Sequence, residues 1–149
     1  MSVLVTDSGF HPDDWTAGFL RPAELGRHPC AVGLGLDLDP ACARAAAVAP
    51  YFPNLALIRI RLAYFGQPEG FALAEALRRH GYAGRLRAQG HVLADQYTLA
   101  RRTGFDEVEI SAELALRQPA EHWRFRGNWR HAAYRSRMRP RAGPGLPDR

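Results

Sequence analysis

The sequence of 149 residues contains no lysine, only two cysteines and no long hydrophobic run. Cys30 and Cys42 stand far apart without a second pair, which excludes a zinc ribbon and a Cys-x-x-Cys redox motif. No stretch reaches the roughly 18 apolar residues of a membrane-spanning helix, and Asp7, Asp13 and Asp14 stand where a signal peptide would be apolar. We therefore expect a cytoplasmic protein with reduced thiols, no metal site and no membrane contact.

The charge of the chain is unevenly distributed. Up to residue 116 there are eleven arginines against thirteen acidic residues, whereas from Arg117 onward nine arginines face only Glu121 and Asp148. The formal charge of +5 at pH 7 therefore arises in the C-terminal part of a nearly neutral body. We predict a single domain over residues 1–138, followed by a disordered tail over 139–149 that is rich in proline and glycine.

Several segments alternate apolar and polar residues with a period of two, which is typical of strands with one apolar face. The pair Gly33 and Gly35 lies inside such a segment and lacks a third glycine, so nicotinamide-dinucleotide binding is disfavoured. Helical spacing alternates with these segments along the chain. The predicted strands span 3–5, 31–37, 55–62, 85–89 and 107–110, and the predicted helices span 40–50, 70–80 and 91–103.

This order predicts an α/β fold with a mostly parallel sheet of about five strands and βαβ crossovers. No predicted strand is apolar on both faces, so helices should cover mainly one face, as in part of a barrel; a three-layer αβα sandwich is the alternative. Residues 11–29 should form a loop that wraps the body. The face opposite the helices should carry Gly33, Gly35, Arg59, Arg61, Arg85, Arg87, Glu107 and Glu109.

Three interpretations of this charged face remain open. Its arginine and glutamate columns can form cross-strand pairs in solvent. Alternatively, the sheet curls so that the charges converge on an anionic ligand, or a partner or second copy covers the face as in a homodimer.

The turn after residues 85–89 is the best candidate for a binding site. Gly90 permits close approach of a ligand, a helix beginning at His91 would present free N–H groups, and Arg87 would lie near the same strand end. A sulfite, sulfate or phosphate group fits such a site. The alternative is that Gly90 only permits a tight turn while His91 lies in solvent.

At these residues the chain resembles domain-of-unknown-function family 934, a group of uncharacterised bacterial proteins. The opening residues 3–7 and the cluster Asp13, Asp14 and Trp15 are also similar to alphaproteobacterial members. The similarity spans about residues 1–135. The motif consists of Arg87, Ala88, Gly90, Val92, Leu93, Asp95 and Gln96, followed by Gly104, Phe105 and Asp106.

The resemblance implies a role in sulfur assimilation, because members are described as encoded beside assimilatory sulfite reductase. It supplies no mechanism and no cofactor. The chain departs from the family pattern after residue 62, where Gln67 and Glu69 replace an Asp and an Arg. Gln67 would lie near the Gly90 turn, at the same edge of the sheet, and joins Arg87, Gly90 and His91 as a candidate anion-binding residue.

The C-terminal segment interleaves aromatic side chains with arginines between Glu121 and Met138. Such a segment can bind nucleic acid, but no nucleic-acid-binding motif is visible, so docking on an acidic protein is the preferred interpretation. A segment whose rings pack on the body while its arginines stay in water is the alternative. The candidate docking residues are Arg124, Arg126, Arg130, Arg135 and Arg137.

Two functions follow. The first is a non-catalytic accessory of sulfate and sulfite reduction that docks on sulfite reductase or its electron donor. The second is a small enzyme, an oxidoreductase by family label, that acts on an anionic sulfur or phosphate compound at the carboxyl edge of the sheet. The first is preferred, because no activated nucleophile, metal set or nucleotide fingerprint can be assembled from the sequence.

Overall fold

The structure is a computed structural model that describes residues 2–27, 30–127 and 129. Within these residues six strands form one sheet in the order β2-β1-β6-β5-β4-β3. Strands β3 to β6 are parallel and follow chain order, whereas β1 pairs antiparallel with both β6 and β2. The strands are β1 (Ser2–Thr6), β2 (Gly9–His11), β3 (Leu34–Leu38), β4 (Leu55–Leu62), β5 (Arg85–Gly90) and β6 (Glu107–Ser111).

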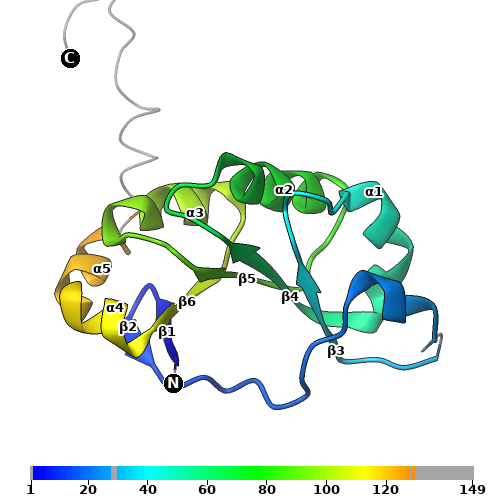
Figure 1. The fold of residues 1–149 in the computed structure, drawn as a ribbon, viewed down its shortest axis with the longest axis horizontal. Coiled ribbons are helices and arrows are strands. Elements are labelled where there is room, and N and C mark those ends of the chain that lie inside the picture. The colour runs from blue at the N-terminus through cyan, green and yellow to red at the C-terminus, as the bar shows by residue number, and fades with distance from the viewer. Residues whose placement is uncertain (1, 28–29, 128, 130–149) are drawn as a thin grey trace, which may run out of the picture.

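The helices lie mainly on one face of the curved sheet. Figure 1 shows α1, α2 and α3 over that face, while the chain between β2 and η1 crosses the opposite face. The fold is therefore the mostly parallel α/β arrangement that the sequence predicts, with helices on one side rather than a three-layer sandwich. The helices are η1 (Pro22–Arg27), α1 (Ala45–Val48), η2 (Ala49–Asn54), α2 (Pro68–Arg79), η3 (Ala94–Gln96), α3 (Tyr97–Thr103), α4 (Ala112–Arg117) and α5 (Ala120–Arg126).

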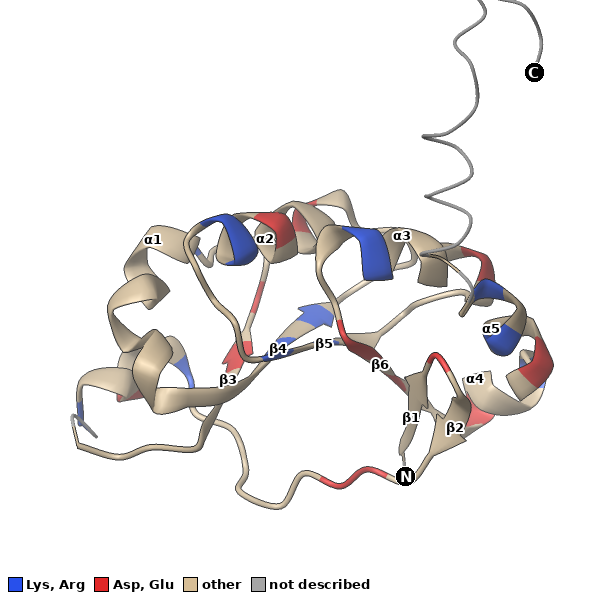
Figure 2. Ribbon diagram, turned by 180° about the vertical axis from the view of Figure 1, so that it is seen from behind, with Lys and Arg blue, Asp and Glu red and all other residues tan. Residues whose placement is uncertain are grey.

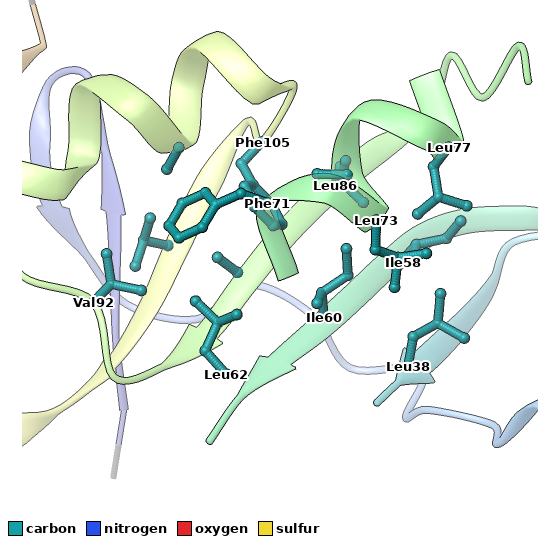
Figure 3. Close-up of a cluster of buried hydrophobic side chains, with 14 of the residues drawn as sticks. Leu38, Ile58, Ile60, Leu62, Phe71, Leu73, Leu77, Leu86, Val92 and Phe105 are labelled. Atoms are coloured by element: carbon teal, nitrogen blue, oxygen red, sulfur yellow. The ribbon is translucent and has the colours of Figure 1, made fainter. Parts of the chain in front are cut away.

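The hydrophobic core lies between the sheet and these helices. In β4 the alternate residues Ile58, Ile60 and Leu62 point toward α2, whose buried Phe71 and Leu77 face them (Figure 3). Because the apolar positions of α2 recur three and four residues apart, they form one stripe along the helix. This packing fixes the carboxyl ends of β4, β5 and β6 relative to one another.

Three local predictions are wrong. The helix expected over 40–50 covers only α1, because Arg44 is extended and the prolines at 50 and 53 lie in the following 3-10 turn. The helix expected from His91 begins at η3, where the Gln96 side chain accepts the Leu93 N–H at 3.0 Å. The first residues of the 31–37 segment lie outside β3, and Val32 is exposed.

Candidate functional site

The charged face of the sheet contains a row of four residues in register. Asp37 on β3 lies beside Arg59 on β4, which lies beside Arg87 on β5, which lies beside Glu107 on β6. Two adjacent arginines repel one another unless carboxylates flank them. The row supplies an acid at each end, and Glu109 reaches both arginines, at 3.0 Å from Arg59 and 3.5 Å from Arg87.

Arg87 is completely buried. Its Nε donates to Glu107 at 2.9 Å, and its two terminal nitrogens each donate to the Asp13 carboxylate at 3.1 Å. Glu107 is also held by Arg85, whose Nε lies 2.7 Å away. A guanidinium without solvent needs such partners, because the cost of removing it from water is several kcal/mol. Arg87 is therefore fully occupied by carboxylates of its own chain.

The loop between β2 and η1 supplies part of this network. Asp13 and Asp14 reach Arg87 and Arg85, and Figure 2 shows the acidic loop residues on the side of the sheet opposite the helices. The Phe19 ring lies 3.7 Å from the Arg59 guanidinium carbon, close enough for a cation–π contact. We call the three arginines 59, 85 and 87 with their carboxylates 13, 14, 37, 107 and 109 the sheet-face network.

The loop can lie close to β3 because Gly35 has no side chain. A Cβ at this position would stand 2.9 Å from the Trp15 ring and 2.5 Å from the Gly18 carbonyl oxygen. The Trp15 indole donates to that same carbonyl at 2.7 Å. The sequence predicted that this loop wraps the body, but not that its carboxylates enter the charged face.

The network shifts the pKa values of several of its members. Burial alone would raise the pKa of Asp13, but the Trp15 N–H and the Arg87 guanidinium outweigh it and lower the pKa below the ordinary value. The hydrogen bond from Arg85 lowers the pKa of Asp14. Burial alone would lower the pKa of Arg59, yet the Asp37 and Glu109 carboxylates raise it. All of these groups are therefore charged at neutral pH.

Of the three interpretations of the charged face, the first is right about the cross-strand pairs, such as Arg87 with Glu107 at 2.9 Å, but wrong about solvent, because Arg87, Glu107 and Glu109 are at most 5% exposed. The chain's own loop covers this part of the sheet. A signal was present in the sequence, because two arginine columns on neighbouring strands need counter-charges, and Asp13 and Asp14 precede a tryptophan in a loop predicted to wrap the body.

The structure separates the four candidate anion-binding residues. Gly90 and His91 line one pocket at the carboxyl ends of β5 and β6. Arg87 points into the sheet-face network instead. Gln67 is buried, and its side-chain oxygen accepts the Ala63 N–H at 2.8 Å, which closes the turn after β4.

The backbone at position 90 requires a glycine for structural reasons. Its φ of +115° is a conformation that L side chains rarely adopt, and an added Cβ would stand 2.6 Å from the Leu62 carbonyl oxygen on β4. No helix begins at His91, so the backbone N–H groups expected at this turn are not gathered there. The His91 ring stands edge-on to Phe65, with 5.2 Å between their centroids.

The pocket beside this turn has a volume of about 670 Å³. Its charged lining is balanced: Arg59 pairs with Glu109 at 3.0 Å, and Arg117 pairs with Glu113 at 2.7 Å. His91 is the remaining titratable residue among the described lining residues. A pocket of this size at the carboxyl edge of parallel strands can hold a small ligand, with balanced polar groups and no excess of positive charge.

The residues that carry the family motif serve mainly the fold. Ala88, Val92 and Phe105 are fully buried in the core. Gly104 ends α3 with φ +119°, and Asp106 accepts the Leu86 N–H at 2.9 Å, which joins β5 to the approach to β6. Leu93 and Gln96 form the start of η3, and Asp95 is exposed.

Arg124 and Arg126 are exposed on α5, where the sequence predicted a docking segment. Phe125 between them is 77% exposed, and the Arg126 guanidinium carbon lies 5.5 Å from its ring centroid. The other predicted docking residues, Arg130, Arg135 and Arg137, and the expected tail 139–149, lie outside the described residues.

Nothing in the described part of the chain is arranged as a metal site or a bilayer-crossing helix. There, no group of three or more His, Cys, Asp or Glu side chains is placed to hold a metal ion, and no helix has the length and apolar character needed to cross a bilayer.

These observations define a small α/β domain with helices on one face of its sheet and a partly buried ion-pair network on the other. Residues 35–139 match the model of the family described as bacterial protein of unknown function (DUF934). The chain belongs to this family. No curated protein and no solved structure matches the chain.

Proposed function

We propose that the protein is a non-catalytic accessory of assimilatory sulfate and sulfite reduction that docks on sulfite reductase or its electron donor. The pathway comes from the family resemblance of the motif at residues 87–106. The observation that carries docking is the outer surface of α5. There Phe125 is largely exposed between Arg124 and Arg126, and neither arginine has a carboxylate partner among the described residues.

Exposed aromatic and arginine side chains are the residue types that dominate the energy of protein interfaces. They also stand in contrast to the sheet-face network, whose three arginines are all paired with carboxylates. Guanidiniums without internal partners can form new ion pairs with an acidic surface and steer its approach.

The test is association of the full chain with purified sulfite reductase of the same bacterium, measured by biolayer interferometry. Arg124→Glu combined with Arg126→Glu should weaken binding by at least about tenfold, and rising salt should weaken the wild-type complex. Arg79, exposed near the end of α2, offers the control Arg79→Glu, which should bind as wild type. No wild-type binding to sulfite reductase or its electron donor would end this proposal.

A second candidate function rests on the pocket that contains His91. Its position at the carboxyl edge, where parallel sheets place their ligands, favours a small enzyme. The anionic sulfur or phosphate substrate rests on the sequence-based expectation for the Gly90 turn, since the charged lining other than His91 is balanced. His91→Gln preserves the size of an exposed side chain, so folding should be unchanged. Loss of growth on sulfate in His91→Gln, with binding to sulfite reductase intact, would favour the enzyme over the accessory; normal growth would favour the accessory.

A further inference from the structure

A second pocket lies at the carboxyl ends of β3 and β4. Its volume is about 430 Å³, and its apolar wall includes Leu38, Ala47 and Val48. Arg21, Arg44 and Arg61 line the same pocket. None of these residues is among the candidate site residues expected from the sequence, although Arg61 is expected on the charged face.

Three different elements bring the arginines together. Arg61 is near the end of β4, and Arg44 directly precedes α1. Arg21 is positioned by its neighbour Leu20, whose N–H donates to Gly35 at 2.8 Å and whose carbonyl accepts the Asp37 N–H at 2.8 Å. Leu20 thus adds one residue of parallel pairing to the edge of β3 and holds Arg21 beside the strand end.

The electrostatic state of this pocket differs from that of the pocket at His91. Within the described part of the chain, none of the three guanidiniums has an ion pair or side-chain hydrogen bond. Of the two lining carboxylates, Asp37 already accepts hydrogen bonds from the Nε and one terminal nitrogen of Arg59, at 2.6 and 2.7 Å. The carboxylate of Asp39 accepts the Ala41 N–H at 2.9 Å. Positive charge therefore remains in excess around an apolar wall.

We propose that this pocket binds a small organic anion in which a phosphate, sulfonate or carboxylate group carries an apolar body. The arginines would hold the anionic group by charge-assisted hydrogen bonds, and the wall from β3 and α1 would bury the apolar part. The pocket lies where open parallel sheets place their ligands, beyond the carboxyl ends of the strands. This site is independent of docking through α5.

The first measurement is isothermal titration calorimetry of the full chain with hexyl phosphate. Inorganic phosphate has only the anionic group and hexanol only the apolar chain, so each should bind at least about tenfold more weakly than hexyl phosphate. Arg44→Gln and Arg61→Gln should each weaken hexyl phosphate binding about tenfold or more, the usual effect of losing one charge-assisted hydrogen bond. Arg79→Gln removes the same charge from an exposed site outside the pocket and should bind as wild type.

The second measurement locates the ligand through two exposed thiols. Cys42 lines the pocket, whereas Cys30 does not. Alkylation by iodoacetamide, followed for both residues by mass spectrometry, should slow severalfold at Cys42 when hexyl phosphate is present and stay constant at Cys30.

Four results would overturn the proposal, three from calorimetry and one from alkylation. The three calorimetric results are no hexyl phosphate binding up to about 10 mM, a loss of binding in Arg79→Gln as large as in Arg44→Gln or Arg61→Gln, and binding of inorganic phosphate or hexanol as tight as that of hexyl phosphate. Unchanged alkylation of Cys42 under saturating ligand would place the binding elsewhere and overturn it as well. Circular dichroism of each variant is the control for folding, and it should match that of wild type because the substituted arginines are exposed.

Discussion

Arg87→Met is the most direct test of the sheet-face network. Methionine fills a similar length without charge, so little cavity is created and the effect reports mainly the lost ion pairs. Removing one partner of a buried pair costs about 3–5 kcal/mol, because the other charges stay buried. Glu107 keeps Arg85 at 2.7 Å and Glu109 keeps Arg59 at 3.0 Å, so the loss should lie near the lower end, about 3 kcal/mol.

Urea unfolding at pH 7, followed by far-UV circular dichroism, measures this loss as a change in the free energy of unfolding. Arg79→Met is the matched control, because Arg79 is exposed and the same substitution there should change stability by less than about 0.5 kcal/mol. Asp13→Asn should cost about 1 kcal/mol, since its side chain is 26% exposed. The double variant of Arg87 and Asp13 should lose less than the sum of the two single losses.

An Arg87→Met variant as stable as wild type would refute the reasoning. It would mean that the guanidinium gains no more from its carboxylates than its burial costs. Additive losses in the double variant would instead show that Asp13 acts independently of Arg87, contrary to the two contacts of 3.1 Å between them.

Three further predictions concern stability in urea. Because the pKa of Asp13 is lowered by folding, its carboxylate stabilises the fold at every pH above its unfolded pKa of 3.8, and this contribution is lost as the pH falls through the folded pKa. Below about pH 4, wild type should therefore lose more stability than Asp13→Asn, which has no carboxylate to protonate. Gly90→Ala should lower the free energy of unfolding by about 2 kcal/mol and Gly81→Ala by about 1 kcal/mol. Both glycines have a positive φ, but only Gly90 closely approaches the Leu62 carbonyl, so equal losses would contradict a role for that contact. Tyr97→Phe removes a 2.6 Å hydrogen bond to a carboxylate and should cost about 1 kcal/mol, and an unchanged midpoint would contradict this.

Local sequence pattern was enough to predict most of the sheet. The strands β4, β5 and β6 begin where expected and end within one residue of the expected positions, because their period-two alternation reflects one apolar face and one polar face. The short strand β2 was missed, since its three residues pair only through a turn that returns the chain onto β1. Nothing local shows where the chain goes after β1.

The candidate site was harder to predict than the sheet. Gly90 and His91 were correctly placed at a strand end, because the end of a strand is a local property. The face on which Arg87 lies was predicted too, but its partners were not, since they include Asp13, which is 74 positions away in the sequence. Pairing across such a distance is a tertiary property that no local spacing encodes.

The arginines of this lysine-free chain differ in role according to what faces them. Those in the sheet-face network have carboxylates in register or in the covering loop, and Arg78 donates to the backbone carbonyls of Tyr82, Gly84 and Gly104. Guanidiniums satisfied in this way hold the fold together and have little capacity left for a ligand. Recognition is therefore to be sought where no internal acceptor is supplied. Among the described residues, the pocket at the ends of β3 and β4 and the outer surface of α5 both meet this criterion, whereas the buried Arg87 does not.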